Sequence, residues 1–171
     1  MIFLNIGSNL NSKFGNRFDN IQKSLSLLSF KKIEIKSKSS FYETPSYPDN
    51  SHPKFINISI RILYKKSYLD LLKDISSIEI EMGRIKTMKN EPRIIDIDII
   101  DFNGEVVETE NLALPHKAMM DRNFVLFPLR EICPNWSHPI SYEKIDILIK
   151  KLQGKSRNEI TRIDQSDISS A

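Results

Sequence analysis

An alternation of apolar and polar residues limits the possible folds of this chain more than any other feature. Residues 55–64 carry an isoleucine at every second position: Ile56, Ile58, Ile60 and Ile62. Side chains alternate between the two faces of an extended chain, so this pattern predicts a half-buried β-strand. The chain must therefore contain a sheet with at least one covered face.

The rest of the chain mixes strands with helices. Ser67 and Asp70 resemble a capping box at the start of a helix, and Gly83 suits the position after its end. Asn103-Gly104 is a strong hairpin signal, with a return strand expected at 105–109. Because no regular βαβ repeat occurs, we expect an α+β sandwich, an antiparallel sheet with helices packed on it. The other expected elements are strands at 2–6, 33–38 with a continuation at 41–44, and 94–102, and helices at about 14–28 and 143–152.

Composition and charge indicate one soluble domain. Hydrophobic residues make up 40% of the 171 residues, enough for a core without disulfides. The 25 Lys and Arg against 22 Asp and Glu give a net charge of +3, too small to indicate nucleic acid or a membrane surface, although it suits small anions. Residues 1–6 lack the features of a signal peptide, so we expect a cytoplasmic protein. Residues 1–153 are expected to form the domain and residues 154–171 a polar tail.

Cysteine, histidine and glycine usage excludes several kinds of site. Cys133 is the single cysteine, so an internal disulfide or a cysteine metal cluster is excluded. The three histidines are too scattered for a paired zinc motif. The five glycines cannot be assembled into a P-loop or a dinucleotide-binding motif. If the chain binds a nucleotide, side chains and metal must hold its phosphates.

The strongest candidates for chemistry are Asp96 and Asp98 in the expected strand 94–102. Two positions apart on a strand, their side chains point to the same face. Mg²⁺ is usually held by one or two carboxylates together with phosphate oxygens. A solvated acidic strand face is the alternative, but basic residues favour the metal interpretation because arginine binds phosphate oxygens. The basic residues in question are Arg84, Lys86, Lys89, Arg93 and Arg122.

Other residues have both a functional and a structural interpretation. Glu79 lies at the edge of an apolar helix stripe and could face a ligand, but a surface glutamate fits that pattern better. A histidine after a proline, as at His116, is more often structural than catalytic. Phe55 and Asn57 lie on the non-core face of their strand, where they fit either binding of a heterocycle or packing at a loop edge.

Taken in order, these motifs resemble the 6-hydroxymethyl-7,8-dihydropterin pyrophosphokinases of folate biosynthesis. Each motif is weak alone, but their order and spacing together are specific, and they cover about residues 6–139. The chain departs from the family pattern at Glu91, where glycine is usual, and at Lys86, where arginine is common. The segments that carry the resemblance are Ile6-Gly7-Ser8-Asn9-Leu10, residues 39–45, Phe55-Ile56-Asn57, Glu79 with Gly83-Arg84, Pro92-Arg93 with Asp96-Ile97-Asp98, Pro115-His116 and residues 122–129.

The resemblance implies a ferredoxin-like fold and transfer of the terminal diphosphate of ATP to the pterin hydroxymethyl oxygen, with release of AMP. By that similarity, Asp96 and Asp98 hold two Mg²⁺ ions, and Arg84 and Arg93 act on the transferring group. ATP and the pterin would be the partners of a monomer, without nucleic acid or membrane. The implied ATP site comprises Glu79, Lys86, Ile99, His116 and Arg122, and the implied pterin site Thr44, Pro45, Tyr47, Phe55, Asn57 and Phe124.

Two other functions stay open at this point. A metal-dependent nucleotidyltransferase also combines a Gly-Ser turn with an acidic pair on a strand. In such enzymes the two elements lie close in sequence, whereas Gly7-Ser8 and Asp96 are far apart here. A non-catalytic α+β binding module would leave Asp96 and Asp98 unexplained. Release of AMP from ATP in the presence of a hydroxymethylpterin distinguishes the three functions.

Overall fold

A computed structural model of the chain describes residues 1–46, 51–84, 91–152, 154 and 158–163. The predicted roles of Tyr47, Lys86 and Lys89 lie outside the described residues. No helix in the described part of the chain is long and apolar enough to cross a membrane. The strands are β1 (Ile2–Ser8), β2 (Glu34–Lys38), β3 (Phe41–Thr44), β4 (Phe55–Leu63), β5 (Asp96–Phe102), β6 (Val107–Glu108), β7 (Ala113–Leu114) and β8 (Thr161–Ile163). The helices are α1 (Arg17–Phe30), α2 (Tyr68–Glu81), the 3₁₀ helix η1 (Met119–Asp121), α3 (Asn123–Ile132) and α4 (Ile145–Lys151).

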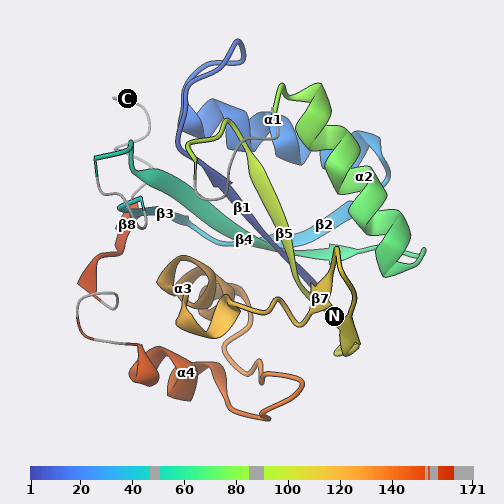
Figure 1. Cartoon of the computed structure of the whole chain (residues 1–171), viewed down its shortest axis with the longest axis vertical. Helices are drawn as coiled ribbons and strands as arrows, with labels where there is room; N and C mark the ends of the chain where they lie inside the picture. The colour runs from blue at the N-terminus through green and yellow to red at the C-terminus, as the bar shows by residue number, and fades with distance from the viewer. Residues whose placement is uncertain (47–50, 85–90, 153, 155–157, 164–171) are drawn as a thin grey trace.

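The main sheet is antiparallel and runs in the order β5-β1-β4-β3-β8. Strands β2 and β3 both pair with β4. The strand expected at 33–38 with a continuation at 41–44 is therefore interrupted and forms two separate strands. Helices α1 and α2 cover one face of the sheet, and α3 and α4 lie on the other side (Figure 1). With β2 and β3 counted as one interrupted strand, the order up to β5 is β-α-β-β-α-β, which is ferredoxin-like and confirms the predicted α+β fold.

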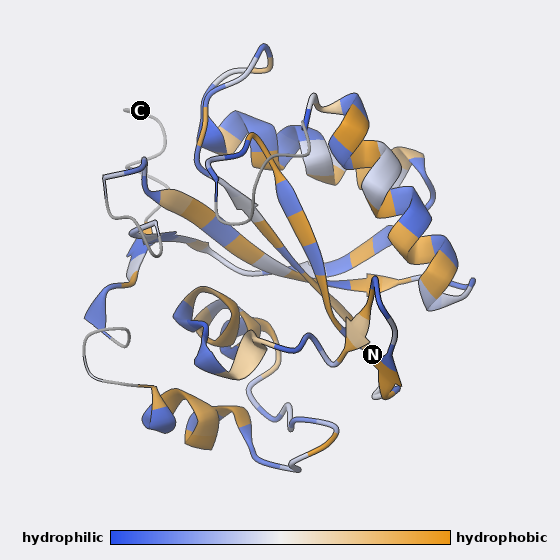
Figure 2. Ribbon diagram, viewed as in Figure 1, coloured by the Kyte–Doolittle hydropathy of each residue, from blue (hydrophilic) through white to orange (hydrophobic). Residues whose placement is uncertain are grey.

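The alternation along the strands separates two hydrophobic cores, and Figure 2 shows it as alternating colours on β4 and β5. The first core lies between the sheet and helices α1 and α2, and it buries the isoleucines of β4 that the sequence predicted. The second lies between the sheet and helices α3 and α4, with Phe3, Ile100 and Trp136 among its members. The polar residues that face this second side near the ends of β4 and β5 belong to the candidate site.

Helix α2 begins and ends as the sequence predicts. The hydroxyl of Ser67 accepts a hydrogen bond from the Asp70 amide at 3.2 Å, and the Asp70 carboxylate accepts one from the Ser67 amide at 3.2 Å. Gly83 follows the helix with a φ of +89°, a left-handed conformation that favours glycine. The Arg84 amide then donates to the Glu79 carbonyl at 2.9 Å, so this turn brings Arg84 next to Glu79.

Strand β5 contains a β-bulge in its pairing with β1. Leu4 lies opposite Ile99, but Phe3 lies opposite Asp101, so Ile100 is the extra residue. Asp101 therefore points to the α3 and α4 side of the sheet. There it is buried, and its carboxylate accepts hydrogen bonds from the indole nitrogen of Trp136 at 2.8 Å and from the Gly104 amide at 2.8 Å. The bulge thus anchors the second core to the strand that carries Asp96 and Asp98.

The hairpin predicted after β5 is only partly correct. Asn103-Gly104 does form a tight turn with positive φ at both residues, closed by a hydrogen bond from the Glu105 amide. The return strand at 105–109 is wrong, because β6 pairs with β7 in a separate two-stranded sheet and not with β5. The outer edge of β5 instead receives a hydrogen bond from the His116 amide to the Ile100 carbonyl at 2.9 Å.

Helix α3 and strand β8 were not predicted from the sequence, and neither was η1. Helix α3 contains Pro128, and residues 122–129 stood out in the sequence only as a segment that carries the family resemblance. Strand β8 lies within the segment 154–171 that was expected to be a polar tail, and it pairs with β3. The division of the chain at residue 153 stays a prediction.

Candidate active site

The register of three strands brings polar side chains together at one end of the sheet, on the face toward α3. Gly7 of β1 lies between Asp96 of β5 and Asn57 of β4. A Cβ atom at Gly7 would come within 2.9 Å of the Asn57 side-chain oxygen, so glycine lets Asn57 reach across the strand. Two residues along β1, Asn5 lies opposite Asp98 on the same face. The two aspartates are therefore positioned by a sheet and not by a loop.

Two arginines form ion pairs with the Asp96 carboxylate. The Arg84 Nη1 atom lies 2.8 Å from Asp96 Oδ1, and the Arg93 Nη1 atom lies 3.2 Å from Asp96 Oδ2. Arg84 also forms an ion pair with Glu79, whose carboxylate accepts a hydrogen bond from the Ile97 amide at 2.8 Å. Burial raises the pKa of Glu79, and the Arg84 charge opposes that rise. Glu79 is thus a half-buried residue that joins the end of α2 to β5 and holds Arg84.

Asp98 is held in a setting that disfavours its charge. Burial and the nearby Asp96 carboxylate raise the pKa of Asp98 to about 7, although Arg122 acts in the opposite direction. The Arg122 Nη1 atom lies 3.5 Å and the His116 Nε2 atom 3.8 Å from Asp98 Oδ2. Two neighbouring carboxylates that repel one another in this way provide a place for a cation.

His116 belongs to this network and is neutral. Burial and the Arg122 charge lower the pKa of His116 to about 4. Its Nδ1 atom accepts a hydrogen bond from the Ala118 amide at 3.2 Å, which places the ring proton on Nε2. That N–H faces the site beside Arg122 and Asp98, where it can donate to an anionic ligand. The sequence favoured a structural histidine here, but the structure brings its side chain to the site.

Polar and aromatic groups adjoin the charged network. Asn57 is buried, and its side-chain nitrogen donates to the Thr44 hydroxyl at 3.2 Å; Pro45 follows Thr44 at the end of β3. The Arg93 guanidinium lies 5.9 Å from the Phe55 ring centre. The Arg122 guanidinium likewise lies over the Phe124 ring, 5.5 Å from its centre. Aromatic rings and arginines are therefore neighbours on both sides of the site.

Ile99 is the predicted site residue that the structure separates from the others. Its side chain is buried in the first core, on the face of the sheet that α1 and α2 cover. Only the backbone of Ile99 can therefore take part in the proposed ATP site.

Asn9 is a residue whose role the sequence did not show. Its side-chain oxygen accepts a hydrogen bond from the Arg93 amide at 2.7 Å, and its nitrogen donates to the Pro53 carbonyl at 3.1 Å. Asn9 is buried and so ties the approach to β4 to the segment that carries Arg93. The available signal was the Gly7-Ser8-Asn9 motif, which does not show which distant segments Asn9 contacts.

Magnesium is the metal that fits this donor set. The part of the chain that the structure describes contains no group of three or more His, Cys, Asp or Glu side chains able to hold a metal ion. Two carboxylates, Asp96 and Asp98, suit a hard cation that takes its remaining ligands from phosphate oxygens and water. A ligand that carries phosphates therefore has to complete such a site.

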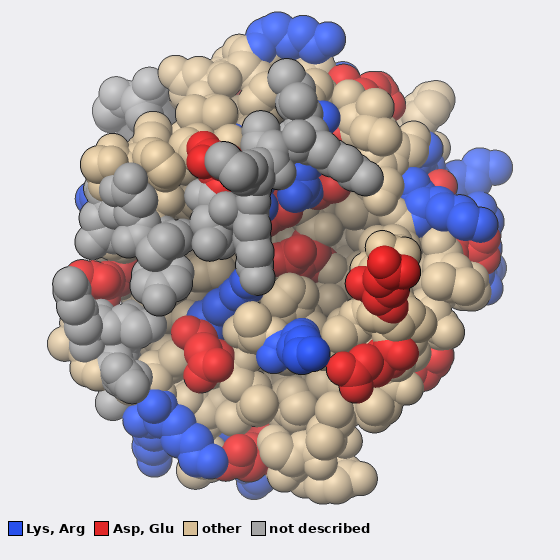
Figure 3. Space-filling view, in the orientation of Figure 1, with Lys and Arg blue, Asp and Glu red and all other residues tan. Residues whose placement is uncertain are grey.

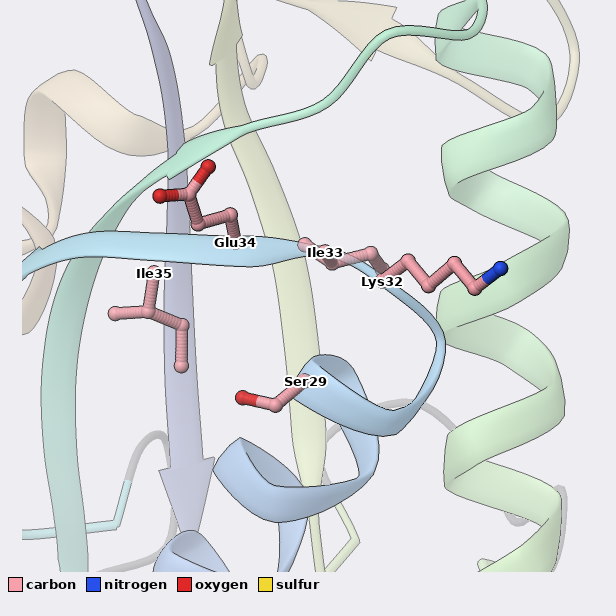
Figure 4. Close-up of a pocket in the computed structure, with 5 residues that line it drawn as sticks. All are labelled: Ser29, Lys32, Ile33, Glu34 and Ile35. Atoms are coloured by element: carbon pink, nitrogen blue, oxygen red, sulfur yellow. The ribbon is translucent and has the colours of Figure 1, made fainter.

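The surface agrees with this location. Figure 3 shows a hollow near the centre of the molecule, with acidic atoms in its depth and basic atoms beside them. A separate surface pocket lies where α1 ends and β2 begins, and it is drawn in Figure 4. There the Lys32 and Glu34 side chains point away from one another. That pocket offers no converging charges, so we place the function at the charged end of the sheet.

The fold and the site define a ferredoxin-like domain whose acidic pair and arginines suit a metal-bound phosphate ligand. Residues 3–134 match the family model described as 7,8-dihydro-6-hydroxymethylpterin-pyrophosphokinase (HPPK). The chain belongs to this family, which confirms the resemblance drawn from its motifs. The match does not favour a nucleotidyltransferase or a non-catalytic module.

Curated relatives and solved structures agree with the family. The folic acid synthesis protein FOL1 of Dictyostelium discoideum is 41% identical over 143 residues, which cover 81% of this chain and 20% of that protein. The 2-amino-4-hydroxy-6-hydroxymethyldihydropteridine pyrophosphokinase of Bacillus subtilis is 36% identical over 125 residues, 72% of this chain and 75% of that protein. The chain spans about a fifth of the length of the folic acid synthesis proteins it matches.

A crystal structure of Plasmodium falciparum HPPK-DHPS superimposes with a TM-score of 0.71. The alignment covers 95% of this chain and 47% of that one, at 16% sequence identity. At this identity the likeness concerns the fold, and it confirms the ferredoxin-like arrangement.

Proposed function

We propose that this chain transfers diphosphate from ATP to 6-hydroxymethyl-7,8-dihydropterin in folate biosynthesis, giving the pterin diphosphate and AMP. The observation that carries the proposal is the pair Asp96 and Asp98 on one strand face, each in contact with an arginine. Family membership and the names of the relatives support the same reaction. The small net charge of +3 supports a small anionic substrate over nucleic acid. A monomer in the cytoplasm is part of the proposal.

The charged residues divide into two groups in this proposal. Asp96 and Asp98 would hold two Mg²⁺ ions, which offset the negative charge of the triphosphate when bound. Arg84 and Arg93 both contact Asp96, so both would turn to the transferring phosphates when a metal ion takes their place at that carboxylate. Arginine suits this task because its planar fork matches phosphate oxygens.

The second group of phosphate contacts lies around Asp98. Arg122 would release Asp98 and bind a phosphate oxygen, and the neutral His116 would donate its Nε2 proton to another. Because His116 keeps that proton at neutral pH, it serves as a donor and not as a base. Lys86 completes the proposed ATP site from outside the described residues, together with Glu79 and the backbone of Ile99.

The pterin would lie between the rings of Phe55 and Phe124. Asn57 carries both a donor and an acceptor, which match the amide-like edge of a pterin. Its bond to Thr44 fixes the orientation of that amide and orders the end of β3, which leads to Pro45 and Tyr47. Stacking of an aromatic pair contributes about 0.5–1.5 kcal/mol beyond its buried area, so two walls can hold a flat heterocycle.

The reaction products test this function. The protein is incubated with ATP, Mg²⁺ and 6-hydroxymethyl-7,8-dihydropterin, and the nucleotide and pterin products are separated by chromatography. We expect AMP and pterin diphosphate in equal amounts. ADP would indicate transfer of a single phosphoryl group, and free pyrophosphate would indicate nucleotidyl transfer. Binding of either substrate without any turnover would indicate a binding module.

The substitution Asp96→Asn tests the metal site within the same assay. We expect turnover to fall by at least about 100-fold, because a ligand charge of the metal is lost while the strand remains intact. Asp146→Asn is the matched control, since Asp146 pairs with Arg130 on the surface at α4. Retained turnover in Asp96→Asn, or equal loss in both variants, would contradict the assignment.

A further inference from the structure

Asn5 is a buried polar residue in the middle of the site face that no motif of the sequence singles out. Its side chain is 4% exposed, and its strand β1 runs between β4 and β5. Asp98 lies opposite Asn5 on one side and Ser59 on the other. An amide in this place must find partners, because an unpaired buried polar group is costly.

The partners of Asn5 fix the orientation of its amide. With its nitrogen turned toward α3, the Asn5 amide lies 3.1 Å from the Phe124 carbonyl, 3.0 Å from the Ile58 carbonyl and 3.2 Å from the Ser59 hydroxyl. Its two N–H groups can donate to the two carbonyls. The reverse orientation would set the side-chain oxygen against both carbonyls and leave it only the Ser59 hydroxyl as a donor, at 3.2 Å. Asn5 therefore connects β1 to β4 and to the first turn of α3.

The Phe124 carbonyl needs such a donor for a reason that the sequence of α3 supplies. In an α-helix, the carbonyl of residue 124 accepts its hydrogen bond from the amide of residue 128. Residue 128 is a proline inside the helix, and proline has no N–H. Pro128 therefore deprives Phe124 of the usual helical bond, and the amide of Asn5 reaches the carbonyl from the sheet.

This hydrogen bond acts at the point where α3 meets the site. Phe124 carries the ring that lies against the Arg122 guanidinium, and Arg122 contacts Asp98. Asn5 is the neighbour of Asp98 in the sheet. One side chain thus joins the backbone of Phe124 to the strand beside the aspartate pair, and it sets how closely the start of α3 approaches the sheet.

We propose that Asn5 is a positioning residue, which supplies the hydrogen bond that Pro128 denies to Phe124 and so holds Phe124 and Arg122 over the site. The proposal rests on the proposed function in one respect, that Phe124 forms a wall of the pterin site. Asn5 itself touches neither substrate in this account. Asn5 affects pterin binding only because it positions the first turn of α3.

A double-mutant cycle of Asn5 and Pro128 tests the proposal. We expect Asn5→Ala to raise the pterin Kd by about tenfold, the equivalent of one buried hydrogen bond, as measured by titration with the pterin in the presence of Mg²⁺ and an ATP analogue. Pro128→Ala restores an N–H at residue 128, so Phe124 regains a donor within its own helix. The double variant should then bind the pterin within about twofold of Pro128→Ala alone.

Rescue by Pro128→Ala separates positioning from a general loss of packing. As a control, Ser24→Ala removes a different buried polar group, on the side of the sheet away from the site, and should leave the pterin Kd unchanged. Equal losses for Asn5→Ala in both backgrounds would overturn the proposal. If Asn5→Ala does not fold alone, then folding of the double variant is the rescue, and failure of both to fold would overturn it.

The unfolding of the four proteins in urea keeps this test distinct from that of the proposed function. If the wild type does not bind the pterin, the proposed function fails, and the cycle is judged on the urea midpoints. Asn5→Ala should then lower the midpoint much less in the Pro128→Ala background than in the wild type. Additive shifts of the midpoint would count against the hydrogen bond from Asn5.

Discussion

At the scale of single residues, the ionised carboxylate of Asp98 lowers the stability of the folded protein. Burial and Asp96 raise the pKa of Asp98 from 3.8 to about 7, and its side chain is 29% exposed. A raised pKa in the folded state means that the favourable contribution of this group is complete below pH 3.8 and is lost as the pH rises through about 7. At pH 8 the ionised Asp98 therefore destabilises the ligand-free protein.

The variant Asp98→Asn should melt at a higher temperature than the wild type at pH 8 without Mg²⁺. We expect a gain of about 1 kcal/mol, or about 3 °C, because solvent reaches part of the carboxylate and Arg122 offsets part of its cost. The gain should vanish as the pH falls toward 4, and calorimetry between these pH values measures it. Asp146→Asn should show no such trend. A lower melting temperature of Asp98→Asn at pH 8 would contradict this account.

The two arginines at Asp96 allow a kinetic prediction. Arg84→Ala and Arg93→Ala should each lower kcat by at least about 100-fold while the Kd of an ATP analogue rises only a few fold, since their contacts to phosphate are expected to tighten in the transition state. Steady-state kinetics and equilibrium titration give the two quantities. Arg130→Ala, at the surface pair with Asp146, is the control. Equal losses in binding and turnover would instead mark both arginines as ground-state phosphate contacts.

At the scale of single elements, strong local patterns were predictable and long-range ones were not. The isoleucines of β4 and the cap of α2 at Ser67 are signals within a few residues, and both are confirmed. Helix α3 was not predicted because Pro128 is a residue that normally ends a helix. The hydrogen bond that Pro128 cannot donate is replaced by one from Asn5, which is more than a hundred residues away in the chain. Helix α1 begins later than expected because Asn16 forms a capping box with Asp19.

The close approach of β1 and β4 gives a prediction for Gly7. In Gly7→Ala the new Cβ would lie 2.9 Å from the Asn57 side-chain oxygen and 3.5 Å from the Phe55 ring. Asn57 must then shift, so we expect the pterin Kd to rise by about tenfold while the ATP-analogue Kd stays the same. Gly154→Ala is the control, since a Cβ there meets nothing within 4 Å. An unchanged pterin Kd in Gly7→Ala would place the pterin elsewhere.

At the scale of the whole molecule, the sequence predicted the fold class but not strand β8, which lies in the segment expected to be a polar tail. The polar segment after Gly154 has no apolar pattern, yet Arg162 pairs with Tyr42 in the register of β8 and β3. Glu131 of α3 accepts a hydrogen bond from the Tyr42 hydroxyl at 2.8 Å and lies 3.6 Å from Arg162. Such contacts depend on surfaces that exist only after folding, so local reading of the sequence could not find them.

In the candidate site, too, contacts within one strand could be predicted from the sequence, whereas contacts between distant segments could not. Alternation along one strand was enough to place Asp96 and Asp98 on one face, and the register of β5 confirms it, since they lie opposite Gly7 and Asn5 of β1. The pairing of Arg122 with Asp98 depends on where α3 packs, and no local pattern encodes it. Glu79 and His116 were ambiguous for the same reason, because their neighbours come from distant parts of the chain.

The bulge in β5 bears on how this strand can change in length. Because Ile100 is the extra residue, its loss would leave a regular strand in which Asp101 still faces Phe3 and the upstream half keeps its pairing. Loss of Ile97, in contrast, would turn Asp96 away from Asp98. A single-residue insertion or deletion can therefore be absorbed at Ile100 without disturbing the aspartate pair, so this is where we expect related chains to differ in length within β5.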